Sequence, residues 1–236
     1  MSNSHKAKAE YKLRNKWMAK YIDYLVSKRV NANILSFLGL LFSIIAAIFL
    51  SIGSIYWPPL LAFPAPLFII IGGLFDILDG EVARRTGNDS SLGAFLDSTL
   101  DRFSDAIIIL GLILGGFLSF LWGYFFLFFS LMIPYTRSRA ENEGLKMKGI
   151  GLMERGERII LLSGALIAET WIYAAGWKIT GKPWVIKEEF FTTIPVTPFF
   201  LTFMIFYFIL LVITCIQRLI FPFKNSNQKR AKINFN

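Results

Sequence analysis

Apolar runs long enough to cross a membrane alternate with short polar segments along most of the chain. A helix needs about 20 mostly apolar residues to span the hydrocarbon core of a bilayer. The alternation predicts an all-α integral membrane protein with six transmembrane helices, each bounded by polar or turn-forming residues. The predicted spans lie near residues 34–55, 62–83, 93–117, 119–140, 157–177 and 198–219.

The segment before the first span follows a different pattern. Between residues 8 and 28, lysines recur every four positions on one helical face. Another face carries apolar and aromatic side chains, namely Trp17, Met18, Tyr21, Ile22 and Leu25. This pattern is typical of an amphipathic helix lying on the membrane surface, although a solvated tail is the alternative. We therefore divide the chain into a cytoplasmic segment with this interfacial helix (1–33), a six-helix membrane domain (34–220) and a basic cytoplasmic tail (221–236).

Basic residues fall almost entirely on one side of the predicted membrane domain. With six spans, both termini and the loops near residues 84–92 and 137–158 share a side, which holds all but three of the 25 Lys and Arg residues. The exceptions are Lys178, Lys182 and Lys187. Loops rich in Lys and Arg stay in the cytoplasm. We therefore expect a multi-pass protein of the cell membrane whose basic side faces the cytoplasm.

Composition narrows the classes of function. With 55% hydrophobic and 17% charged residues, the chain is too apolar for a soluble enzyme or a disordered protein. The net charge of +9 follows from the membrane topology, so we expect no nucleic-acid partner. The single cysteine, Cys215, excludes an internal disulfide, and the single histidine, His5, lies in the polar N-terminal segment. Acid–base or metal chemistry must therefore come from carboxylates.

Acidic residues gather in the second and third predicted spans. Asp76 and Asp79 are three residues apart, and Asp97 and Asp101 are four residues apart, so each pair shares a helix face. We expect the two spans to be antiparallel neighbours, because only the short turn 84–92 joins them. Four facing carboxylates repel one another and need protons or cations. Their number suits a site for two Mg²⁺ or Mn²⁺ ions, and a proton or ion pathway of a transporter is the alternative.

The acids belong to a longer motif with small residues and an arginine. It reads Asp76-x2-Asp79-Gly80-x2-Ala83-Arg84-x8-Gly93-x3-Asp97-x3-Asp101. This motif resembles the signature of the CDP-alcohol phosphotransferase family at all of its fixed positions. The resemblance implies an enzyme that transfers a substituted phosphate from a CDP-linked lipid to an alcohol and releases CMP. It also implies a homodimer.

The resemblance assigns roles to individual residues. It implies that Asp76, Asp79 and Asp97 are metal ligands, and that Asp101 is both a ligand of the second metal and the general base. A second set matches positions that contact the CDP-lipid, namely Asn31, Ala32, Asn33, Ile34, Gly80, Ala83, Arg84 and Ser90. Asp105 lies outside the signature, and the sequence leaves open whether it supports the site.

The acceptor alcohol is indicated by the second half of the chain. The segments 135–141, 149–158 and 213–219 resemble the phosphatidylinositol-phosphate synthases of actinobacteria and the archaetidylinositol-phosphate synthases of archaea. Inositol phosphate is a dianion, so its site needs fixed cations. The candidate phosphate-binding residues are Arg137, Arg155, Arg158 and Arg218.

Several points about the acceptor stay open. Of Arg155 and Arg158, we expect one to bind phosphate and the other to pair with a glutamate. Arginines at cytoplasmic span ends also follow from topology alone, and Glu154 with Arg158 could form an ordinary helix salt bridge. Glycerol 3-phosphate, used by phosphatidylglycerophosphate synthases, is the alternative acceptor. The sequence does not distinguish diacylglycerol from archaeol as the lipid.

Overall fold

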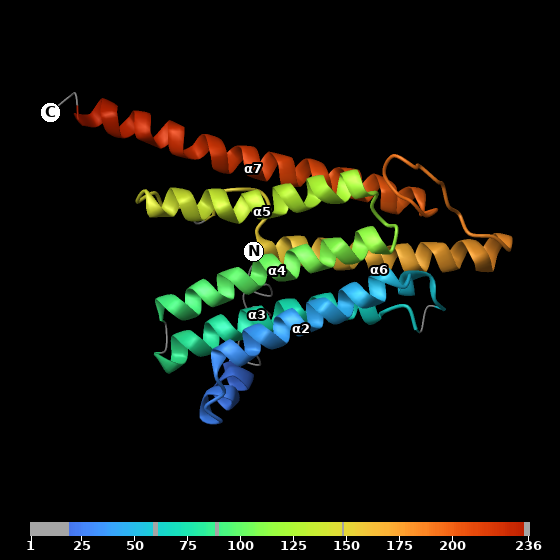
Figure 1. The fold of residues 1–236 in the computed structure, drawn as a ribbon, viewed down its shortest axis with the longest axis horizontal. Helices are drawn as coiled ribbons and strands as arrows, with labels where there is room; N and C mark the ends of the chain where they lie inside the picture. Colours follow the sequence, from blue (N-terminus) through green and yellow to red (C-terminus); the bar gives the residue numbers. More distant parts are fainter. Residues whose placement is uncertain (1–18, 59–60, 88–89, 148, 234–236) are drawn as a thin grey trace, which may run out of the picture.

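The computed structural model describes residues 19–58, 61–87, 90–147 and 149–233, with side chains up to residue 224. In these ranges the regular structure is helical, apart from one isolated bridge between Ile186 and Val196. A short helix over 19–27 precedes the others. The remaining elements are α2 (Ala32–Ser51), η1 (Ser54–Tyr56), α3 (Pro64–Thr86), α4 (Ser91–Leu114), α5 (Phe120–Asn142), α6 (Arg155–Thr180) and α7 (Pro198–Ile233). The long helices α2 to α7 run lengthwise beside one another (Figure 1).

The expected all-helical membrane architecture is confirmed at a coarse level. The six long helices coincide with the six apolar segments of the sequence. By length and hydropathy, three of them could cross a membrane, namely α2, α6 and α7 as far as Lys224. Helices α3 and α4 carry the clustered aspartates, and such charged residues count against a membrane span. The count of six spans therefore stays a prediction.

Helix α2 is the main packing partner of the two helices that carry the acids. It packs closely against both α3 and α4, whereas α3 and α4 have little backbone contact with each other. The sequence correctly indicates a short connection between α3 and α4, but it does not reveal that α2 is the main neighbour of both. The reason is that the length and hydropathy of an apolar segment do not specify which other helices it packs against in the membrane.

Small residues allow these close crossings. A Cβ atom on Gly39 of α2 would lie 3.2 Å from the carbonyl oxygen of Gly72 on α3. On the other side of α2, a Cβ atom on Gly111 of α4 would lie 2.7 Å from the Cα of Ala47. Helices approach this closely in membrane proteins where glycine or alanine lies at the contact. The two crossings bring the acid-bearing parts of α3 and α4 toward each other.

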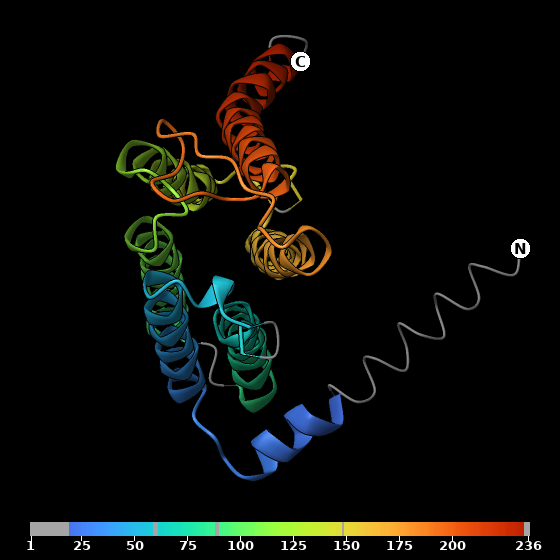
Figure 2. The same ribbon diagram turned by 90° about the vertical axis from the view of Figure 1, so that its right-hand side faces the viewer.

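Helix α6 packs on α3, and α7 packs on α5, which completes the bundle (Figure 2). A Cβ atom on Gly73 of α3 would lie 3.1 Å from the side chain of Ile159 on α6. Farther along α6, Glu169 is fully buried and accepts hydrogen bonds of 2.9 Å from the Tyr56 hydroxyl and the Thr197 amide. It therefore ties η1 and the start of α7 to α6.

The short helix 19–27 rests on the bundle through a small apolar contact. Ile22 and Leu25 are buried in a cluster with Leu35 of α2 and Val82 of α3, while Tyr21 is 53% exposed. The apolar face that the sequence predicted is thus divided into two parts. Ile22 and Leu25 pack on the protein, whereas Tyr21 stays exposed. Lys12, Lys16, Trp17 and Met18 lie outside the described residues. The placement of this segment on a membrane surface stays a prediction.

Candidate active site

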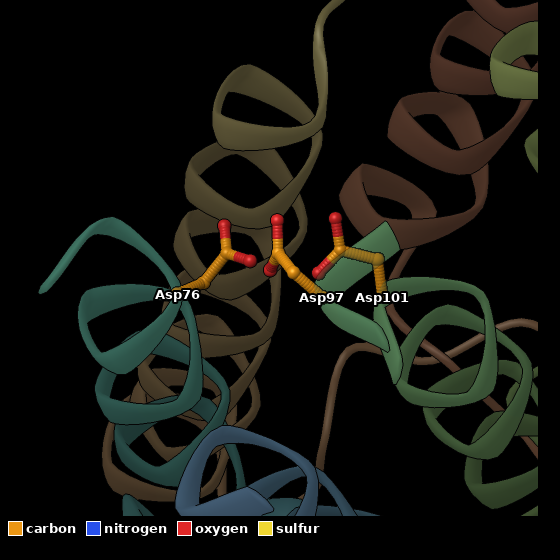
Figure 3. A group of neighbouring side chains, drawn as sticks. All are labelled: Asp76, Asp97 and Asp101. Carbon is orange, nitrogen blue, oxygen red and sulfur yellow. The ribbon is translucent and has the colours of Figure 1, made fainter. Parts of the chain in front are cut away.

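Three aspartates from two helices meet at one point. Asp76 extends from α3, and Asp97 and Asp101 extend from successive turns of α4, with their carboxyl groups in a row (Figure 3). One oxygen from each lies within 4.8 Å of the others. All three side chains are partly exposed. The sequence predicted that these acids converge, and the geometry agrees.

Asp79 lies deeper than the other three acids. It is 2% exposed, and one of its oxygens accepts a hydrogen bond from the Ser36 hydroxyl of α2. Its Oδ1 atom is buried and has no hydrogen-bond partner among the described residues. A buried carboxylate oxygen without a partner is costly unless a cation or donor reaches it. The four acids therefore offer the oxygen donor set that Mg²⁺ and Mn²⁺ prefer.

The Arg155 guanidinium lies directly on the acid cluster. Its Nη1 atom is 2.7 Å from Oδ1 of Asp76 and 2.6 Å from Oδ1 of Asp101. Its Nε atom is 3.4 Å from Oδ1 of Asp105. The sequence placed Arg155 in a pocket for the acceptor phosphate. The structure places it among carboxylates that are also candidate metal ligands, so its side chain contacts the acid cluster itself.

Two other predicted phosphate-binding arginines are buried and engaged with protein acceptors. Arg158 is 6% exposed, and its Nη2 atom is 2.9 Å from Oδ2 of Asp105. Arg218 is 3% exposed and donates hydrogen bonds of 2.9 Å to the carbonyl oxygens of Ile150 and Ile133. Arg218 therefore holds the loop before α6 against α5.

The remaining expectations about the arginines have mixed outcomes. Arg137 forms an ion pair of 3.0 Å with Glu141 one turn later on α5. The expected pairing of Arg155 or Arg158 with a glutamate is wrong, because both pair with Asp105. The alternative salt bridge between Glu154 and Arg158 is also wrong, since Glu154 instead forms a capping box with Glu157 at the start of α6.

A cavity of about 880 Å³ opens beside Asp79 and Asp97, between α2, α3 and α4. Of the residues assigned to the CDP-lipid, Ile34 does not line it and is 56% exposed. The others all line it: Asn31, Ala32, Asn33, Gly80, Ala83, Arg84 and Ser90. Asn31 and Ser90 also cap the starts of α2 and α4, where their side chains accept backbone hydrogen bonds.

The sequence alone does not predict that several other residues lie around the cavity and the acids. Arg29 lines the cavity and has a left-handed backbone with a φ of 53°, which is unusual for a residue other than glycine. Ser36 reaches Asp79 across 43 positions of sequence. Asp105 reaches two arginines of α6, so the question left open by the sequence is answered by geometry: it is part of this cluster.

The chain is similar to known proteins in sequence. It is 50% identical over 95 residues to an archaetidylinositol phosphate synthase of Methanothermobacter thermautotrophicus, a match that covers 40% of this chain and 48% of that protein. It is 32% identical over 162 residues to a phosphatidylinositol phosphate synthase of Mycobacteroides abscessus, covering 64% of this chain and 68% of the relative. The match thus spans about half the length of the archaeal relative.

Solved structures show the same fold. A phosphatidylinositol phosphate synthase of Mycobacterium tuberculosis, crystallised with manganese and citrate, has a TM-score of 0.65 at 25% identity, over 87% of this chain and 88% of that chain. A structure of that enzyme with CDP-DAG bound has a TM-score of 0.62 at 26% identity, over 86% and 91% of the two chains.

A family model extends the likeness across most of the chain. The model that describes CDP-alcohol phosphatidyltransferases matches residues 29–224, which include every acid and arginine discussed above. The match begins just before α2 and ends within α7, so it covers α2 to α6 and most of α7. The chain therefore belongs to the CDP-alcohol phosphatidyltransferase family.

Proposed function

We propose that the protein is a membrane enzyme of phospholipid biosynthesis that transfers a lipid phosphate from a CDP-linked lipid to inositol 1-phosphate and releases CMP. The observation that carries the proposal is the meeting of Asp76, Asp97 and Asp101 beside the large cavity. The names of the relatives, which are phosphatidylinositol and archaetidylinositol phosphate synthases, support the choice of acceptor.

In this proposal the cavity holds the CDP moiety and the four acids hold divalent cations. Asp79 and Asp97 belong to the group of four acids and also line the large cavity. The phosphates of a nucleotide bound in the cavity could therefore lie beside these two acids. Asp76, Asp79, Asp97 and Asp101 would hold two Mg²⁺ or Mn²⁺ ions. The cations would neutralise the pyrophosphate and the departing CMP. The manganese in the related structure supports a divalent ion of this type.

Asp101 is the proposed general base. It would take the proton from the acceptor hydroxyl, and the hydroxyl oxygen would bond to the phosphorus that carries the lipid. The bond between that phosphorus and the CMP oxygen would break in the same displacement. Because Asp101 also contacts Arg155, a phosphate on Arg155 would bring the acceptor hydroxyl close to the base. This arrangement needs no covalent enzyme intermediate.

The same chemistry would serve other phosphorylated alcohols. Glycerol 3-phosphate carries the same dianionic group as inositol 1-phosphate, so it is the second candidate acceptor. A transporter has less support, because the family of this chain is a transferase family. The proposal also places the protein in the cell membrane as a homodimer with the acid cluster on the cytoplasmic side.

An acceptor screen tests the proposal. Purified protein is given CDP-archaeol or CDP-diacylglycerol, Mg²⁺ or Mn²⁺, and radiolabelled inositol 1-phosphate, inositol or glycerol 3-phosphate. We expect a labelled lipid and an equal amount of CMP with inositol 1-phosphate, and none with unphosphorylated inositol. A faster reaction with glycerol 3-phosphate would replace the proposed acceptor, and no product with any acceptor would refute the function.

A further inference from the structure

Asp105 occupies a special position between the acid cluster and α6. It lies one helical turn after Asp101 on the same face of α4, and its side chain is 14% exposed. Each of its oxygens faces a different arginine of α6. Oδ1 is 3.4 Å from Nε of Arg155, and Oδ2 is 2.9 Å from Nη2 of Arg158.

These ion pairs bridge two helices that do not pack directly. Within the described helices, no Cα atom of α4 lies within 8 Å of a Cα atom of α6, because α6 packs on α3. A cavity of about 30 Å³ lies there, lined by Asp105, Arg158, Ser130 and Tyr207 among others. The long arginine side chains therefore reach α4 across a gap, and Asp105 is the residue of α4 that both of them contact.

Asp105 can fix the direction of the Arg155 guanidinium. A guanidinium is planar, so an acid that holds its Nε edge also determines where its Nη atoms point. Here Nε faces Asp105, and Nη1 points to Asp76 and Asp101. Asp105 is itself anchored by Arg158, which also donates a hydrogen bond of 3.3 Å to the Ser130 carbonyl oxygen.

We propose that Asp105 is a positioning residue that holds Arg155 beside Asp101, so that Arg155 can receive the phosphate group of the acceptor. The inference rests on the proposed function, since it assigns a task to one residue of that site. Asp105 touches neither substrate. Its effect reaches the reaction through the orientation of Arg155.

The first test separates acceptor binding from donor binding. In Asp105→Asn the side chain keeps its shape but loses its charge, so Arg155 is free to turn. We expect the acceptor KM to rise about tenfold, as is typical when a supporting partner is lost, while the KM for the CDP-lipid stays unchanged. Asp105→Glu restores the charge and should recover part of the loss. Equal increases in both KM values would contradict the inference.

A control addresses general destabilisation. Glu169→Gln removes the carboxyl group of another buried acid, far along α6 from the acid cluster. We expect this variant to lower the melting temperature without changing the acceptor KM. If Asp105→Asn behaves in the same way, with a lower melting temperature and an unchanged acceptor KM, Asp105 is only structural and the inference is wrong.

A binding measurement makes the inference testable apart from turnover. Inorganic phosphate is titrated into the wild-type protein and into the variants Arg155→Met and Asp105→Asn. Isothermal titration calorimetry measures the affinity of each protein for phosphate. We expect Arg155→Met to abolish phosphate binding and Asp105→Asn to weaken it about tenfold. The inference is overturned if either substitution leaves the affinity for phosphate unchanged, or if the wild-type protein does not bind phosphate. Failure of the wild type to use inositol 1-phosphate, with these binding results intact, refutes the proposed function alone.

Discussion

Among single side chains, Arg155 has the most consequential position, because its Nη1 atom approaches the same oxygens that a divalent cation would use. Those oxygens are Oδ1 of Asp76 and Oδ1 of Asp101. A divalent cation and the guanidinium would compete for these atoms, since like charges repel each other at close range. We therefore expect the Nη1 atom of Arg155 to move away from at least one of them when a metal binds.

This competition predicts a change in metal affinity. In Arg155→Met the guanidinium is absent, so Mn²⁺ should bind about tenfold more tightly, which corresponds to about 1.4 kcal/mol. Free Mn²⁺ can be followed by electron paramagnetic resonance during a titration. Arg137→Met is the matched control, because it also removes one positive charge but pairs with Glu141 outside the cluster. Unchanged or weaker Mn²⁺ binding in Arg155→Met would show that there is no competition.

The proposed base gives a second prediction for a single residue. Asp101→Asn keeps the size of the side chain but cannot accept a proton, so turnover should fall by at least about 100-fold. Binding of the CDP-lipid should largely survive, because Asp101 does not line the large cavity. Equilibrium binding of the nucleotide and the rate of CMP release measure the two effects. Loss of nucleotide binding together with turnover would argue against a role as base.

Sequence predicts the residues of the site better than their partners. The three- and four-residue spacings on α3 and α4 are local, so the convergence of the acids could be inferred. The contacts of Ser36 with Asp79 and of Asp105 with Arg155 join residues 43 and 50 positions apart. Such pairs depend on how helices cross, and no local pattern encodes that. The burial of Arg158 and Arg218 was missed for the same reason.

At the scale of helices, the two glycine crossings hold α3 and α4 against α2. The apolar runs predict where helices lie in the sequence, because length and hydropathy are properties of one segment. They do not predict that α2 packs against both α3 and α4. Gly72 and Gly111 are signals of close packing, but their partners Gly39 and Ala47 become visible only in the fold.

The crossing of α2 with α4 can be tested by adding one methyl group. In Gly111→Ala the new Cβ atom would lie 2.7 Å from Ala47, so the helices must separate, and we expect a loss of about 1–3 kcal/mol. Gly164→Ala is the control, since a Cβ atom there meets nothing within 4 Å. Thermal unfolding in detergent measures both. Equal melting temperatures for the two variants would contradict the proposed packing.

At the scale of the whole molecule, the uneven distribution of Lys and Arg residues and the long α7 indicate how the protein is oriented in the membrane. The C-terminal part of α7 extends beyond the other helices (Figure 1), and the side of the acid cluster carries almost all Lys and Arg residues in the predicted topology. Positive charge near the ends of spans is retained in the cytoplasm. The acid cluster should therefore open toward the cytoplasm, where a soluble acceptor phosphate would be found.

Cysteine labelling tests this orientation, because the chain has one cysteine, the buried Cys215. In a Cys215→Ser background, Glu143→Cys and Glu189→Cys place thiols on exposed side chains at opposite ends of the bundle. A membrane-impermeant maleimide should label Glu189→Cys in intact cells and Glu143→Cys only after permeabilisation. The reverse pattern would invert the topology.

The account depends most on divalent cations held by the four aspartates against a CDP-linked lipid. The direct measurement is CMP release by the purified wild-type protein, with CDP-lipid and inositol 1-phosphate present, as the cation is removed and returned. We predict no release in excess EDTA and full recovery when Mg²⁺ or Mn²⁺ is added back. Release that continues at the same rate in EDTA would contradict the account.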